Sequence, residues 1–127
     1  MRVWISPSRG QVVVTPRGEL DVATGPALDR TIQRALDEAP EATSLVLDLT
    51  DVTFIDSSGV KTLIRARRQL RGRDPVDGQL VVCNVRPPVH RILLLLGIGS
   101  LAAMHPVPED LPPTTQITLD PPVARKV

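Results

Sequence analysis

Aromatic residues are scarce in this sequence, which has no tyrosine, one phenylalanine and one tryptophan among 127 residues. Proteins that bind single-stranded nucleic acid stack bases on aromatic side chains, so this shortage argues against such a partner. The net charge at pH 7 is only +1, so the molecule as a whole has no strong field to attract nucleic acid or an acidic membrane. We therefore expect no nucleic-acid partner.

Cysteine and long apolar runs are also scarce. Cys83 is the single cysteine, so no internal disulfide can form, and its apolar neighbours predict a buried structural thiol. The longest apolar run, 92–96, is far too short to span a membrane, and the N-terminal residues lack the apolar core of a signal peptide. A lone thiol suits a reducing compartment. The sequence thus predicts a cytoplasmic protein without membrane insertion.

Residues for metal binding or catalysis are few. The two histidines, His90 and His105, are 15 residues apart, which is not a metal-ligand spacing, so we predict no metal and no cofactor. A serine nucleophile would need a base and an orienting acid. The sequence around Ser58 is not the Gly-x-Ser-x-Gly turn of the hydrolases. We predict that the chain is not an enzyme, with a small serine enzyme as the weaker alternative.

Strand and helix patterns alternate along the chain. Apolar runs predict strands at 3–5, 12–14, 44–49, 79–85 and 101–105, with a turn at 8–10 that joins the first two in a hairpin. Helical spacing of apolar residues predicts helices over 26–39, from 57 or 58 to 72, and over 87–96. The order β-β-α-β-α-β-α-β predicts an α/β domain, with helices packed on a mixed sheet of about four or five strands.

Proline is concentrated at the end of the chain, where six of the 13 prolines lie in the last 22 residues. Proline at that density forbids a continuous helix. We predict a folded domain over 1–105 and an extended, proline-rich C-terminal tail over 106–127. Within this tail, 116–119 is the one piece that could pair as a strand.

The segment 45–60 is the most informative about function. An apolar strand and a short turn lead to Asp56-Ser57-Ser58-Gly59 at the start of a helix. Free backbone N–H groups and the helix dipole favour negative charge there, so a phosphate on a serine would be tolerated. One residue suffices to cap the helix, and we assign Asp56 or Ser57 to that role. Ser58 is then left for modification.

Three blocks of the sequence resemble the STAS domain, and most closely the bacterial anti-sigma-factor antagonists. The blocks are Gly18-Glu-Leu-Asp21, the central stretch from Leu47 to Gly59, and Val81 to Arg91 with Leu96-Gly-Ile98. Together they extend over roughly residues 3–105. Two features depart from the family pattern: Lys61 stands close after the central motif, where a small residue is frequent, and the tail replaces a usual final helix.

The resemblance implies a non-enzymatic protein that binds an anti-sigma factor, itself a serine kinase, and so frees a sigma factor. In that family the kinase phosphorylates the second serine of the central motif, here Ser58, and this switches the antagonist off. A separate serine phosphatase restores it. The alternative is a STAS accessory subunit of another cytoplasmic assembly, such as a lipid transporter. Phosphorylation by a specific kinase would distinguish the two.

We expect the partner surface to surround the phosphorylation site and to consist of Asp21, Asp56, Ser57, Ser58, Gly59, Lys61 and Arg65. Six cations lie between 61 and 73 with no acid among them. For the two nearest Ser58 an acidic partner surface is favoured, and for the distal arginines a solvated helix face. The leucines at 94 and 95 are interpreted as part of a broad core face, with an apolar partner or self-association patch as the alternative.

Overall fold

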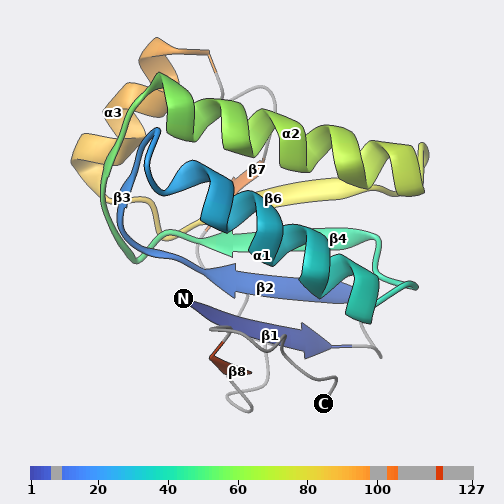
Figure 1. Ribbon diagram of the computed structural model, residues 1–127. Coiled ribbons are helices and arrows are strands. Elements are labelled where there is room, and N and C mark those ends of the chain that lie inside the picture. The colour runs from blue at the N-terminus through green and yellow to red at the C-terminus, as the bar shows by residue number, and fades with distance from the viewer. Residues whose placement is uncertain (7–9, 98–102, 106–116, 119–127) are drawn as a thin grey trace.

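The computed structural model describes residues 1–6, 10–97, 103–105 and 117–118, and its main feature is one mixed sheet (Figure 1). The sheet has the strand order β7-β6-β4-β2-β1-β8. Strand β1 runs antiparallel to β2 and β8, whereas β2, β4, β6 and β7 are mutually parallel. The strands are β1 (Arg2–Ser6), β2 (Gln11–Thr15), β4 (Ser44–Asp48), β6 (Gln79–Cys83), β7 (Ala103–His105) and β8 (Ile117–Thr118).

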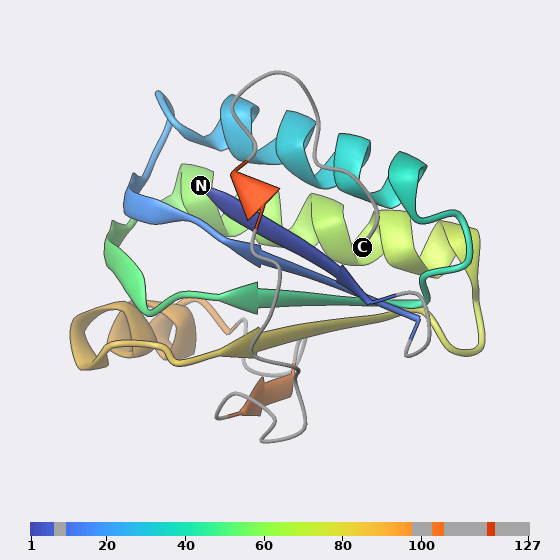
Figure 2. The same ribbon diagram turned by 90° about the horizontal axis from the view of Figure 1, so that it is seen from below.

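Within the described residues three helices complete the α/β fold, as predicted: α1 (Gly25–Glu38), α2 (Ser57–Arg73) and α3 (Pro87–Leu95). Figures 1 and 2 show α1 and α2 side by side over one face of the sheet. Helix α1 begins next to Pro26 and ends before Pro40, because proline suits a first turn and blocks a last one. None of the helices in the described ranges is long and apolar enough to cross a membrane.

The central strands are buried on both faces. Alternate residues face α1 and α2, and the residues between them form a second cluster on the opposite face. In that cluster Trp4, Val13, Val46 and Val81 lie in register across four neighbouring strands. Cys83 belongs to the same cluster, so the expectation of a buried thiol is confirmed. Burial, together with the charge of Asp48, raises the pKa of this thiol to about 12.

A second, two-stranded sheet was not expected from the sequence. It pairs β3 (Arg17–Leu20) in parallel with β5 (Asp51–Ile55). Only Leu20 of β3 is buried, and the pairing register shifts between Gly18 and Glu19, so β3 lacks the alternating apolar pattern of a strand. The sequence predicts a short turn before Asp56, whereas the structure has the strand β5 there. This small sheet is what positions the start of α2.

The two ends of the chain test the predicted N-terminal hairpin and the possible strand in the C-terminal tail. The predicted turn at 8–10 falls largely outside the described residues, but Ser6 pairs with Gln11, which confirms the hairpin. Most of the predicted tail, 106–116 and 119–127, also lies outside the described part. Its residues Ile117 and Thr118 pair with the N-terminal end of β1, as the possible strand at 116–119 anticipated. The division at residue 105 stays a prediction.

Helix α3 presents leucines to solvent. Leu94 and Leu95 are 55% and 75% exposed, so their interpretation as part of a broad core face is wrong. Helical spacing also predicts Leu96 in one buried stripe with Val89 and Leu93, but Leu96 is 50% exposed. The helix has nine residues and buries Val89 and Leu93, which are four positions apart on one face. Each further residue turns about 100° around the axis, which carries Leu94 and Leu95 away from the core, whereas Leu96 lies on the face of Val89 and Leu93 but follows the last helical residue.

Candidate functional site

The small sheet brings two separate loops together at the start of α2. Leu20 at the end of β3 lies opposite Ile55 at the end of β5, and the Asp56 N–H donates to the Leu20 carbonyl at 3.2 Å. Because parallel strands end at the same edge of a sheet, the residues that follow them are neighbours. The structure therefore places Asp21 near the helix that carries Ser58, as expected.

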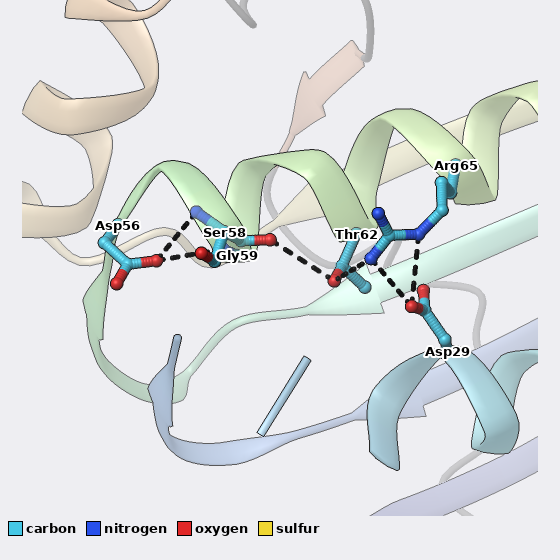
Figure 3. A network of polar contacts seen from close by, with 6 residues as sticks. All are labelled: Asp29, Asp56, Ser58, Gly59, Thr62 and Arg65. Carbon is cyan, nitrogen blue, oxygen red and sulfur yellow. Dashed lines mark hydrogen bonds and ion pairs between the residues drawn. The ribbon is translucent and has the colours of Figure 1, made fainter. Parts of the chain in front are cut away.

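Asp56 caps helix α2 (Figure 3). One of its carboxylate oxygens, Oδ1, accepts from the backbone N–H of Ser58 at 2.9 Å and of Gly59 at 3.1 Å. Of the two capping candidates, Asp56 is confirmed, and Ser57 is an exposed first helical residue. The Ser58 side chain is half-buried and makes no hydrogen bond among the described residues. Its hydroxyl is therefore not needed to hold the helix start.

The cap also uses most of the backbone donors that we expected to be free. A helix start has four N–H groups without a partner in the helix itself. Those of Asp56, Ser58 and Gly59 are bonded to Leu20 or to the cap, which leaves the N–H of Ser57 without a partner in the described part of the chain. The expectation of several outward-facing donors is wrong, because the motif's own aspartate occupies them.

Gly59 is the residue on which the small sheet and α2 meet. A Cβ atom at this position would clash with the Leu20 carbonyl oxygen and would lie 2.7 Å from Ile55 Cγ1. Only glycine permits this close approach of helix and strand. Gly59 is buried, so it contributes shape to the predicted partner surface and offers no side chain to a partner.

Asp21 organises the loop between β3 and α1. Its Oδ1 accepts from the N–H of Ala23 at 3.0 Å and of Thr24 at 3.1 Å, a local turn that leads into α1. The Thr24 hydroxyl donates to the Glu19 carbonyl at 2.6 Å, which ties the loop back to β3. Asp21 thus has a structural role in the loop, and its side chain is half-exposed.

Arg65 and Lys61 differ in whether their side chains form ion pairs. Arg65 donates from Nε and Nη2 to Asp29 Oδ2 at 3.1 and 2.7 Å, and from Nη2 to Thr62 Oγ1 at 3.1 Å (Figure 3). This ion pair joins α2 to α1, so Arg65 is held at the edge of the predicted partner surface. Lys61 is exposed, and no ion pair or hydrogen bond of its side chain is found in the described ranges.

The arginines farther along α2 also include both exposed and hydrogen-bonded side chains. Arg68 and Arg71 are exposed, as a solvated helix face requires, but Arg73 is partly buried. Arg73 donates from Nη1 to the Leu36 carbonyl at 2.9 Å and from Nη2 to the Ala39 carbonyl at 2.8 Å. These are the last carbonyls of α1, so Arg73 caps a helix other than its own. The interpretation as a solvated cation is wrong for this residue.

The comparisons with known proteins agree with this geometry. Residues 5–110 match the family model of the STAS domain. An anti-sigma F factor antagonist from Paenibacillus polymyxa is 29% identical over 83% of this chain and 86% of its own length. The solved anti-sigma factor antagonist from Mycobacterium paratuberculosis is 28% identical, with a TM-score of 0.68 over 85% of this chain and 87% of its own.

A further solved structure supports the fold itself. The anti-sigma factor antagonist SpoIIAA in its unphosphorylated form has a TM-score of 0.68 over 87% of this chain and 90% of its own, at 24% identity. The family model covers most of the present sequence, and the sheet, helices and loops take the arrangement of that fold. The chain belongs to the STAS domain family, among relatives that are anti-sigma-factor antagonists.

Proposed function

We propose that this chain is an anti-sigma-factor antagonist that is switched off by phosphorylation of Ser58. It binds an anti-sigma factor that is also a serine kinase, and so frees a sigma factor in the cytoplasm. A serine phosphatase returns the phosphorylated form to the active one. The names of the relatives from Paenibacillus polymyxa and Mycobacterium paratuberculosis, at 29% and 28% identity, support the first part of this proposal.

The observation that carries the assignment of Ser58 is that Asp56 alone caps α2. The Ser58 hydroxyl has no bonding partner in the described part of the chain, so a phosphate can be added without breaking the cap. A phosphate adds a charge of about −1.5 to −2 at pH 7. Each 1.4 kcal/mol lost from an interface lowers affinity about tenfold, so one phosphate suffices as an off-switch.

The partner surface that we propose follows from where the candidate residues lie. The side chains of Asp21, Asp56, Ser57, Ser58 and Lys61 contribute at the shared edge of β3, β5 and α2. Gly59 lets α2 pack closely against β3 at this edge. Arg65, which is paired with Asp29, lies at the margin of the surface. An acidic group on the partner would match the free charge of Lys61.

The chain contributes only a hydroxyl to the chemistry. The Ser58 Oγ forms a bond to the γ-phosphorus of ATP while the bond to the bridging oxygen breaks and ADP leaves. The hydroxyl proton passes to a base of the kinase. Histidine is the usual base of a serine nucleophile. His90 is exposed on α3 and has no side-chain hydrogen bond in the described residues, so we propose that the chain itself is not an enzyme.

The test combines phosphorylation and binding with the cognate anti-sigma kinase. Mass spectrometry after incubation with ATP should place the phosphate on Ser58. Ser58→Ala should bind the kinase without being phosphorylated, and Ser58→Asp should fold and bind weakly. Ser57→Ala is the matched control and should still be phosphorylated. Phosphate on Ser57 alone, or equal binding by Ser58→Asp and the parent, would refute the assignment.

A further inference from the structure

The start of α2 is poorly supplied with groups that could neutralise an added phosphate. Two of its N–H groups are bonded to Asp56 and a third to Leu20. The carboxylate of Asp56 is two positions from Ser58, and that of Asp21 lies in the neighbouring loop. A phosphate on Ser58 would therefore meet negative charge and few free donors, and a cation must come from a side chain.

Arg65 is the larger cation near the site, but it is already engaged. Its guanidinium is bonded to the Asp29 carboxylate and the Thr62 hydroxyl, at 2.7–3.1 Å. Drawing it to a phosphate would break the ion pair between α2 and α1 and leave Asp29 without its cation. Along α2, the first cation after Ser58 that has no such partner in the described part of the chain is Lys61.

The helix places Lys61 within reach of Ser58. Residues three apart lie on one side of a helix, with Cβ atoms about 5–6 Å from each other. Helical side chains also point back toward the N-terminus, so a long side chain covers the turn that precedes it. Lys61 is exposed and flexible, and its ammonium group can therefore approach an oxygen on Ser58 without moving the backbone.

We propose that Lys61 binds the phosphate of phosphorylated Ser58 within the same helix. This inference rests on the proposed function, because it concerns the form of the protein in which Ser58 is phosphorylated. In the unmodified protein Lys61 is a free cation on the partner surface. In the phosphorylated protein it is paired internally. Phosphorylation therefore changes the surface twice, by adding a dianion and by withdrawing a cation that the partner would otherwise contact.

The experiment uses the full chain with phosphoserine inserted at position 58 during translation, so that no kinase is needed. Phosphorus NMR then follows the second ionisation of the phosphate with pH. Lys61 favours the dianion, so Lys61→Gln should raise the pKa of the phosphate by about 0.2–0.7 relative to the Lys61 protein, the range of an exposed ion pair. Lys61→Arg should restore the lower value.

Arg68→Gln is the matched control, because it removes one exposed cation from the same helix farther from Ser58. It should leave the pKa of the phosphate within experimental error. Equal values for the Lys61→Gln and Arg68→Gln proteins would overturn the proposal. A kinase that ignores Ser58 would instead refute the proposed function, while the titration of the inserted phosphoserine would be unaffected. Circular dichroism should show the same helix content in all variants.

Discussion

Gly59→Ala should destabilise the protein, although alanine normally stabilises a helix relative to glycine. The added Cβ would clash with the Leu20 carbonyl and stand 2.7 Å from Ile55 Cγ1, so α2 and β3 must separate. Overpacking of this kind costs about 1–3 kcal/mol, and weakening the bond from the Asp56 N–H to Leu20 costs about 1 kcal/mol more. Alanine returns up to about 1 kcal/mol through its helix propensity. We expect a net loss of about 2 kcal/mol.

The matched control is Gly72→Ala in the same helix, where a Cβ would meet no atom within 4 Å. There the helix propensity acts alone and should stabilise by about 0.5–1 kcal/mol. Urea unfolding, followed by the fluorescence of Trp4, measures both changes. In thermal unfolding a loss of 2 kcal/mol corresponds to roughly 8 °C for a domain of this size. A Gly59→Ala protein as stable as the parent would show that the contact with Leu20 does not constrain the helix start.

Four further predictions follow from the contacts described above. Arg73→Met should cost about 1 kcal/mol in urea unfolding, because it removes two hydrogen bonds to carbonyls at the end of α1 that keep their backbone donors, whereas Arg71→Met should change the free energy of unfolding by less than about 0.5 kcal/mol. Cys83 should resist alkylation at pH 8 until the protein unfolds. Because its pKa rises from 9.0 to about 12 on folding, stability is fully present below pH 9 and should fall as the pH rises toward 12, a slope that Cys83→Ala should lack. Asp21→Asn keeps the oxygen that accepts in its turn, so folding should be unchanged by circular dichroism, while phosphorylation of Ser58 or binding of the kinase should weaken; unchanged values for both would remove Asp21 from the switch. Deletion of 106–127 should lower the free energy of unfolding by less than about 1 kcal/mol, because strand β8 is only two residues long, and a loss of several kcal/mol would contradict the tail as a separate unit.

The sequence predicted the elements whose pattern is local. The strands at the centre of the sheet are buried on both faces and read as continuous apolar runs, and the helices show apolar spacing with proline or glycine at their ends. The motif at Asp56–Gly59 could be found because capping depends on adjacent residues. The small sheet could not be predicted in this way, since β3 buries only Leu20 and is held by its pairing with β5, more than 30 residues away.

At the site, the sequence predicted which residues lie close together but not which of them form hydrogen bonds or ion pairs with other elements. The neighbourhood of Asp21 and Asp56 followed from the resemblance, whereas the pairing of Arg65 with Asp29 depends on how two helices cross. The same holds for Arg73, whose acceptors belong to another helix. A run of cations looks uniform in a sequence. In the structure its members separate into bonded and free groups because α1 lies along one side of α2 only.

The bonds between α1 and α2 determine how firmly the helix that carries Ser58 is held. Arg65, Gln69 and Arg73 attach α2 to α1 at intervals of four residues along its length. With Asp56 fixing the first turn, the helix is anchored from its start to its end. If Ser58 is phosphorylated as we propose, we expect the added phosphate to change the charge of this surface without moving the helix. A probe of backbone conformation should then give the same signal for both forms, and only a molecule that contacts this edge should distinguish them.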